Sequence, residues 1–283
     1  MISRYRLGLP ALLLTGFYLV ALAVAALIAL TSGGLALLWR LTLFTPVDES
    51  TPATWPNVLV MLVAGLPCAW ALWQCLRGPL AGPPPEQDRA VRRLRIALYA
   101  AAAYGLISPL MSDWFGAAIL DIASMAPLVV LFPPVLGSSL RHAGQVRVTG
   151  LLGYGGAGAS IVLGLVGLRM PGLLALICAG AALLWAILIL RAQREDGRWT
   201  RSTVRYGTAG LVFPFVAMPV AAVLGDMGTV YADATAALDV LFTIWLARSA
   251  HDLARPTQSA GTVANAELDP QTTRKRSDAD PPR

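Results

Sequence analysis

The chain has 283 residues, of which 56% are hydrophobic and only 13% are charged, and its mean hydropathy is +0.63. A soluble domain carries about 25% charged residues, so this composition excludes an ordinary soluble globular protein. The net charge of +6 comes from arginines in short loops between apolar stretches, which indicates membrane topology rather than nucleic-acid binding. The sequence therefore predicts an all-α, polytopic integral membrane helical bundle without a nucleic-acid partner.

Eight apolar stretches follow one another along the chain, each close to the length of about 20 residues that a helix needs to cross the hydrocarbon core. The predicted spans are residues 8–30, 57–76, 96–112, 115–138, 148–168, 172–190, 207–225 and 229–248. The first span is too long for a cleavable signal sequence, so we interpret it as a retained signal-anchor. Residues 34–44 are too short to cross, and we expect them at the outer interface or in a short return.

The basic residues orient this predicted bundle. With the N-terminus in the cytoplasm, every lysine and arginine except Arg40 and Arg169 falls on the inner side, as the positive-inside rule describes. An even number of spans then places both termini in the cytoplasm. We expect residues 1–255 to form the transmembrane bundle and residues 256–283, which hold few large apolar side chains, to form a disordered cytoplasmic tail. The arginine-rich and alanine-rich composition favours the lipid bilayer of a bacterial plasma membrane.

The eighth span carries the most informative polar pattern. Thr235, Asp239 and Thr243 are spaced by four residues, so we expect them on one face of a helix. An ionised carboxylate near the midplane costs about 2.5–3.5 kcal/mol on insertion scales, which predicts that the Asp239 face points into the bundle. Asp233 lies nearer the outer surface. No basic residue lies at matching depth, so we expect Asp239 to be protonated or in contact with water.

A second acidic position occurs in the fourth span, where Asp121 and Ser124 share one helix face nearer the outer side. The candidate proton, cation or ligand path therefore consists of Asp239, Asp233, Asp121, Thr235, Thr243 and Ser124. A structural interpretation stands beside it, in which Asp239 donates a hydrogen bond to a neighbouring helix and the other two acids reach water.

Small residues mark the fifth span. Gly156, Ser160 and Gly164 recur every four residues, and such spacing lets helix backbones approach closely. This pattern predicts a helix-packing face, either within the chain or in a contact with a second copy or a membrane partner protein.

Several kinds of site are not expected. His142 and His251 fall in predicted cytoplasmic positions, and the chain holds neither a His-Glu-x-x-His motif nor a Cys/His cluster, so we expect no metal centre. The three cysteines lie in apolar segments and are expected to be buried packing residues. No nucleotide-binding motif occurs, and no cofactor is expected.

Three functional hypotheses remain. The first is a small transporter or proton/cation-coupled carrier that uses the intramembrane aspartates. The alternative is a non-catalytic membrane component of a complex, which associates through the glycine face. The third is an intramembrane enzyme that modifies a lipid or isoprenoid, with a protonated aspartate as its general acid.

Overall fold

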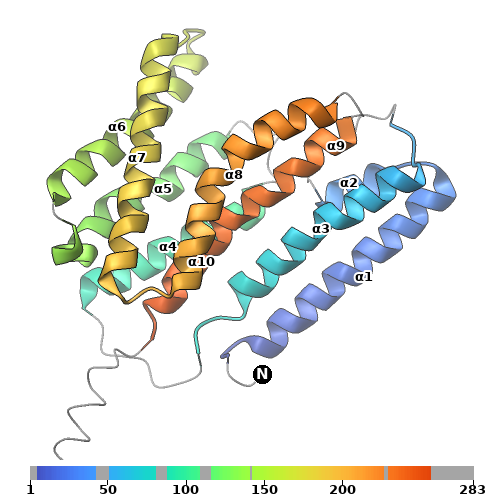
Figure 1. The fold of residues 1–283 in the computed structure, drawn as a ribbon, viewed down its shortest axis with the longest axis horizontal. Helices are drawn as coiled ribbons and strands as arrows, with labels where there is room; N and C mark the ends of the chain where they lie inside the picture. The colour runs from blue at the N-terminus through green and yellow to red at the C-terminus, as the bar shows by residue number, and fades with distance from the viewer. Residues whose placement is uncertain are drawn as a thin grey trace, which may run out of the picture.

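The computed structural model describes residues 5–42, 51–80, 88–108, 116–140, 142–225 and 229–255. Within these ranges the regular secondary structure is helical, and only two isolated β-bridges and short connecting turns interrupt it, so the expected all-α class is confirmed (Figure 1). The α-helices are α1 (Gly8–Ser32), α2 (Ala36–Thr42), α3 (Trp55–Leu76), α4 (Arg89–Ile107), α5 (Gly116–Leu136), α6 (Ala143–Leu165), α7 (Gly172–Asp196), α8 (Arg201–Gly225), α9 (Thr229–Ala234) and α10 (Val240–Asp252). Two 3₁₀ segments, η3 (Gly137–Ser139) and η4 (Thr235–Asp239), complete the described structure.

Seven segments of the described chain are long and apolar enough to cross a membrane, which makes this a multi-pass membrane protein. Six of them are α1, α3, α5, α6, α7 and α8, and the seventh is the stretch Val230–Asp252, which α9, η4 and α10 form together. The expected span 96–112 corresponds to α4. This helix starts seven residues earlier than expected, at Arg89, and its first two turns carry four arginines, so it is less apolar than the other spans. It nevertheless packs against α5 and α10 inside the bundle.

Two of the sequence expectations fall on residues that the structure leaves undescribed. Residues 109–112, the end of the third expected span, lie outside the described ranges, and so does the tail at 256–283. The short segment expected at 34–44 is described up to Thr42. Its helix α2 packs so that Leu38 and Trp39 are buried against α1 and α3, and its position at the outer interface or in a short return stays a prediction.

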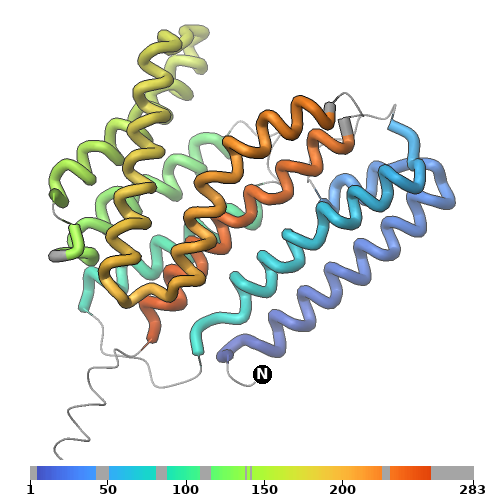
Figure 2. Tube along the Cα trace, viewed as in Figure 1, coloured from blue at the N-terminus to red at the C-terminus, as the bar shows by residue number. Residues whose placement is uncertain are grey.

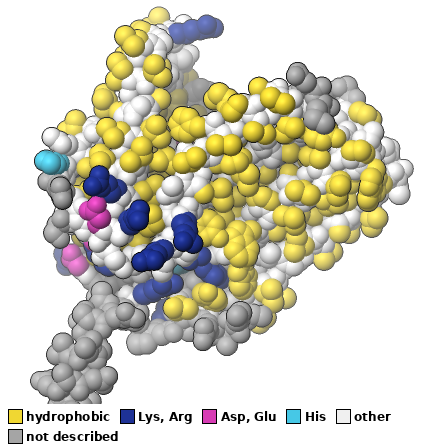
Figure 3. Space-filling view, viewed as in Figure 1, with side chains coloured by type: hydrophobic (Ala, Val, Ile, Leu, Met, Phe, Trp, Pro, Cys, Tyr) yellow, Lys and Arg dark blue, Asp and Glu magenta, His cyan; other side chains and the backbone are white. Residues whose placement is uncertain are grey.

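The helix α10 lies at the centre of the bundle, in contact with α3, α4 and α8 (Figure 2). The helices α1 and α3 run side by side along one flank, whereas α6 and α7 form a hairpin whose connecting end projects beyond the other helices (Figure 1). The described arginines gather mainly at the opposite end of the bundle (Figure 3). This end is the one predicted to face the cytoplasm, and we call it the arginine-rich end.

Aromatic side chains fill the core towards the arginine-rich end. Phe132 of α5 stacks on Trp245 of α10 with ring centroids 6.2 Å apart, and it meets Trp185 of α7 edge to face at 6.1 Å. The Trp245 indole N–H donates to Gln193 Oε1 at 2.9 Å, so a buried polar contact ties α10 to α7. These contacts join three helices that are far apart in the sequence, and they fix the position of α10.

Glycines allow α6 and α7 to pack closely. A Cβ on Gly153 would lie only 2.5 Å from a backbone nitrogen of α7, and a Cβ on Gly156 would collide with Cys178. By contrast, Gly164 has no neighbouring atom within 4 Å of that position, and both Ser160 and Gly164 are exposed. Gly156 therefore packs within the chain, whereas the other two residues of the predicted glycine face make no such contact.

Candidate functional site: an acidic cavity between the helices

A cavity of about 500 Å³ opens between α4, α5, α6 and the η4–α10 junction, and it also reaches α2 and α3. Its volume falls within the range of about 300–1,000 Å³ that is typical of small-molecule sites. Its wall mixes apolar side chains with many polar ones. The polar lining residues are Thr42, Cys68, Tyr104, Ser108, Asp121, Ser124, Tyr154, Asp239 and Thr243.

The two carboxylates of this acidic cavity come from different helices and different depths. Asp239 stands at the end of η4, close to the middle of the stretch Val230–Asp252. Asp121 lies in the second turn of α5, close to the end of the bundle that lies opposite the arginine-rich end. The cavity therefore runs from near that end, at Asp121, to the middle of the bundle, at Asp239.

The segment around Asp239 differs from the continuous α-helix that the sequence predicts. Residues Thr235–Asp239 form a 3₁₀ helix, in which each residue turns about 120° rather than about 100°. Four residues then separate Thr235 from Asp239 by about a third of a turn, so the two do not share a face. The Thr235 hydroxyl instead donates to the Ala232 carbonyl at 2.7 Å.

The structure thus brings together four of the six candidate residues. Asp121, Ser124, Asp239 and Thr243 line the acidic cavity. Thr235 and Asp233 do not line it. Asp233 and Asp239 are both exposed, but of the two only Asp239 lies in the cavity wall, although only six positions separate them in the chain.

A close approach of α4 to α10 shapes one wall of the cavity. A Cβ on Gly105 would lie 2.5 Å from the Thr243 hydroxyl oxygen, so a larger residue here would displace the Thr243 side chain. Thr243 is itself buried, and it stands one helical turn after Asp239. Gly105 therefore allows α4 to pack against the Thr243 side chain in the cavity wall.

Two tyrosines belong to the site, and the sequence analysis did not single them out. Tyr104 of α4 and Tyr154 of α6 line the same cavity as Asp121. The Tyr104 hydroxyl donates to the Ala117 carbonyl. Tyrosines in membrane helices usually lie at the interfaces, so the midspan position of Tyr154 is the sequence signal that could have identified it.

The two carboxylates of the cavity have no hydrogen-bond or ion-pair partner in the described part of the chain. Neither the Asp121 nor the Asp239 carboxylate forms a hydrogen bond or ion pair with any residue of the described ranges, and Ser124 donates only to the Asp121 backbone carbonyl at 2.7 Å. The same part of the chain contains no group of three His, Cys, Asp or Glu side chains placed to hold a metal ion. The cavity thus offers two acceptor groups to a proton, a cation or a hydrogen-bond donor from outside.

The fold and the cavity define an all-α multi-pass membrane protein with an acidic, partly aromatic cavity between its helices. Comparisons with protein-family models, with curated proteins and with solved structures found no match to this chain.

Proposed function

We propose that this protein is a small transporter of a bacterial plasma membrane, a proton- or cation-coupled carrier whose binding site is the acidic cavity. One observation carries the proposal: Asp121 and Asp239, from separate helices, line a single cavity of about 500 Å³. A membrane protein tolerates such costly side chains where they face water or a ligand within the bundle.

The composition of the cavity indicates the class of solute. Tyr104, Tyr154 and Phe242 supply aromatic surface beside the two carboxylates, and aromatic rings with nearby anionic groups favour cations. A small organic cation would place its charge between Asp121 and Asp239 and its apolar part against the rings. The 3₁₀ break at η4 supports the proposal, because interrupted helices line the solute sites of many carriers.

The test uses the full chain in proteoliposomes under an imposed pH gradient. Internal pH is followed with pyranine, and uptake of radiolabelled tetraethylammonium serves as a cation probe. We expect the wild type to exceed protein-free liposomes in at least one of these fluxes. We expect Asp239→Asn to reduce that flux by about tenfold or more, which corresponds to about 1.4 kcal/mol.

Asp233→Asn is the matched control, because it makes the same change in the same span but outside the cavity wall. Its flux should stay within about twofold of wild type. Equal activity of Asp239→Asn and wild type would remove Asp239 from the path. If liposome lipids were instead chemically converted in an Asp239-dependent way, the cavity would belong to an intramembrane enzyme.

A second candidate function rests on the surface of α6. Ser160 and Gly164 are exposed, and they lie in the part of the α6–α7 hairpin that projects from the bundle (Figure 1). Small residues at this spacing suit close contact with another membrane helix. A role as a component of a complex predicts that Gly164→Leu abolishes association, measured by native mass spectrometry of detergent-purified protein, whereas an unchanged assembly would count against it.

A further inference from the structure

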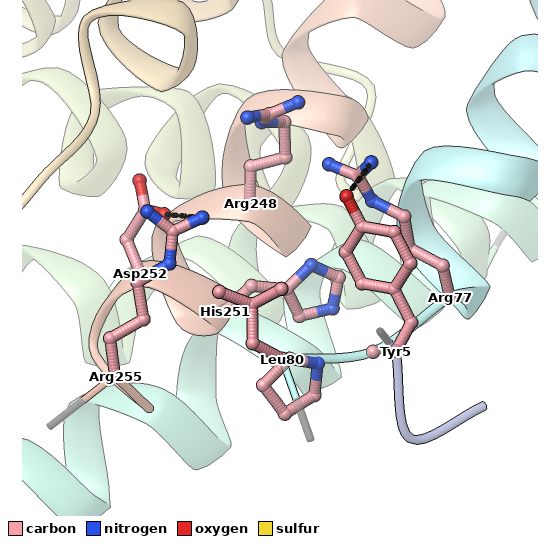
Figure 4. Close-up of a pocket in the computed structure, with 9 residues that line it drawn as sticks. Tyr5, Arg77, Leu80, Arg248, His251, Asp252 and Arg255 are labelled. Carbon is pink, nitrogen blue, oxygen red and sulfur yellow. Dashed lines mark hydrogen bonds and ion pairs between the residues drawn. The ribbon is translucent and has the colours of Figure 1, made fainter. Parts of the chain in front are cut away.

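A second, smaller polar pocket lies at the arginine-rich end, apart from the acidic cavity. It is enclosed by the start of the chain, the end of α3 and the end of α10. Its volume of about 10 Å³ leaves room for about one water molecule. Figure 4 shows the side chains around it. Its charged and polar lining consists of Tyr5, Arg77, Arg248, His251, Asp252 and Arg255.

Positive charge exceeds negative charge in this pocket. Three guanidinium groups line it, and Asp252 is the single acid in its wall. The Asp252 carboxylate is already occupied: one oxygen accepts from the Thr200 backbone N–H at 2.9 Å and from the Thr203 hydroxyl at 2.6 Å. Its other oxygen pairs with Arg255 at 3.4 Å. Asp252 forms an ion pair only with Arg255, and three guanidinium groups share this one carboxylate.

The two remaining arginines bond only to neutral groups within the described chain. Arg248 donates to Gln74 Oε1 at 3.0 Å and to the Ser202 hydroxyl at 2.8 Å. Arg77 donates to the Tyr5 hydroxyl at 3.0 Å, and its Nε is buried without a hydrogen-bond partner. Partly buried guanidinium groups without a carboxylate are costly, and an anion with several acceptor oxygens would relieve that cost.

His251 is a buried, unsatisfied side chain in the wall of the pocket. Its side chain is only 5% exposed, and neither ring nitrogen makes a hydrogen bond of normal geometry, although the Cys75 backbone lies close enough to act on the ring. Buried polar atoms are nearly always satisfied by protein or water. In Figure 4 the imidazole appears between Arg255 and Tyr5, among the pocket's basic side chains. His251 therefore adds to the polar wall of the pocket, but its buried nitrogens offer no accessible donor to a ligand.

We propose that the phosphate group of an anionic phospholipid binds at the mouth of this pocket, because the enclosed space itself has room for only about one water molecule. Guanidinium groups form strong charged hydrogen bonds with phosphate oxygens. Arg77 and Arg248 each have five N–H donors, more than their bonds to Tyr5, Gln74, Ser202 and Thr203 use. The location selects the lipid as the source of the phosphate. The pocket lies where membrane helices α3 and α10 end and α1 begins, which is the depth of the headgroups, and basic pockets between such helices bind phospholipid headgroups.

The test measures lipid binding to the purified full chain by native mass spectrometry, with dioleoyl phosphatidylglycerol as the probe and dioleoyl phosphatidylcholine as the neutral-headgroup comparison. We expect wild type to bind phosphatidylglycerol at least about tenfold more tightly, as is typical when charged hydrogen bonds are gained. Arg77→Gln should remove most of this preference. Arg191→Gln is the control, because it removes the same charge from an exposed side chain distant from the pocket, paired only with Glu195.

A variant pair at Leu80 keeps the test decisive if Arg77→Gln folds poorly. Leu80 lines the pocket, and its side chain is 43% exposed, so substitution here leaves the arginine network in place. Leu80→Glu adds a carboxylate that competes for the guanidinium groups, and it should abolish the preference for phosphatidylglycerol. Leu80→Gln, equal in size and neutral, should retain it.

Three results would overturn the proposal. The first is an equal affinity of the wild type for both lipids. The second is an identical lipid preference in Leu80→Glu and Leu80→Gln. The third is tight binding of inorganic phosphate alone, tested by its ability to raise the melting temperature, together with no effect of phosphatidylglycerol. That third result would assign the pocket to a free phosphate rather than to a lipid.

Discussion

Two aspartates on the same membrane stretch, Asp239 and Asp252, stand in opposite surroundings. Asp252 is 3% exposed, and Thr200, Thr203 and Arg255 hold its carboxylate. Asp239 borders the acidic cavity, and no residue of the described ranges binds its carboxylate. One acid thus serves to join helices and the other remains available, although only thirteen positions separate them in the sequence.

The comparison extends to the two halves of the bundle. Towards the arginine-rich end, hydrogen bonds between side chains link α10 to α7 and α8, as in the contact from Gln193 Nε2 to the Ser249 hydroxyl at 3.3 Å. The other half contains the acidic cavity and the 3₁₀ break η4. Polar side chains stabilise the bundle where they are paired, and they create a binding site where they are not.

The largest expected effect comes from breaking the Asp252 network. Asp252→Ala leaves the Thr200 backbone N–H and the Thr203 hydroxyl without the carboxylate that they donate to. Each buried group left unsatisfied costs about 1–3 kcal/mol, and the half-exposed Arg255 adds little to this loss. We expect a corresponding drop in the free energy of unfolding in detergent, followed by tryptophan fluorescence. Glu195→Ala is the control, because Glu195 pairs with Arg191 at the surface and such pairs contribute about 1 kcal/mol at most. Similar losses in the two variants would contradict the assignment.

A smaller loss should follow when α6 is pushed away from α7. Gly153→Leu places a side chain against the α7 backbone, and overpacking of this kind costs about 1–3 kcal/mol. Gly164→Leu makes the same change at a position with no neighbour within 4 Å, and it should leave the melting temperature of the detergent-purified monomer unchanged. If both variants melted alike, the α6–α7 contact described here would be incorrect.

The polar contact between α7 and α10 should contribute somewhat less. Gln193→Leu leaves the Trp245 indole N–H and the Ser249 hydroxyl without their partner, and each unsatisfied buried group costs about 1–3 kcal/mol. Because leucine also adds apolar packing, we expect a net loss of about 1–2 kcal/mol in the free energy of unfolding. Gln145→Leu, at an exposed position on α6, serves as the control and should cost less than about 0.5 kcal/mol.

The smallest effect on stability is expected at the cavity itself. Asp239→Asn removes a charge that no described side chain neutralises, so the free energy of unfolding should change by less than about 1 kcal/mol. The same variant is expected to lose flux in proteoliposomes. A large loss of stability would instead show that Asp239 joins helices as Asp252 does, and the contrast between the two aspartates would disappear.

Hydropathy predicted the positions of the helices well, because the apolar character of a segment decides whether it can cross the hydrocarbon core. The expected span 57–76 and the helix Trp55–Leu76 nearly coincide, as do 115–138 and Gly116–Leu136. The ends at the arginine-rich side were less well predicted. There α4 continues to Arg89, α7 to Asp196 and α10 to Asp252, since helices can extend beyond the hydrocarbon core while their charged side chains reach water.

The site was only partly predictable. Asp239 and Asp121 could be identified because an acid inside an apolar span is costly wherever the helix lies. Their presence in one cavity depends on how α5 packs beside α10, which spacing along the chain does not encode. The same holds for the burial of His251, expected in a cytoplasmic position, because neighbours distant in sequence enclose it. The sequence also contains no recognisable sign of the 3₁₀ segment, which places Thr235 on a different face from Asp239.

The 3₁₀ segment η4 also has a mechanical consequence for the acidic cavity. A 3₁₀ helix rises about 2.0 Å per residue and turns about 120°, whereas an α-helix rises about 1.5 Å and turns about 100°. If the five residues Thr235–Asp239 rewound as α-helix, the segment would shorten by about 2.5 Å and rotate α9 against α10 by about 100°. This segment therefore has the geometry of a screw, in which a small axial movement of one helix is converted into a large rotation about Asp239.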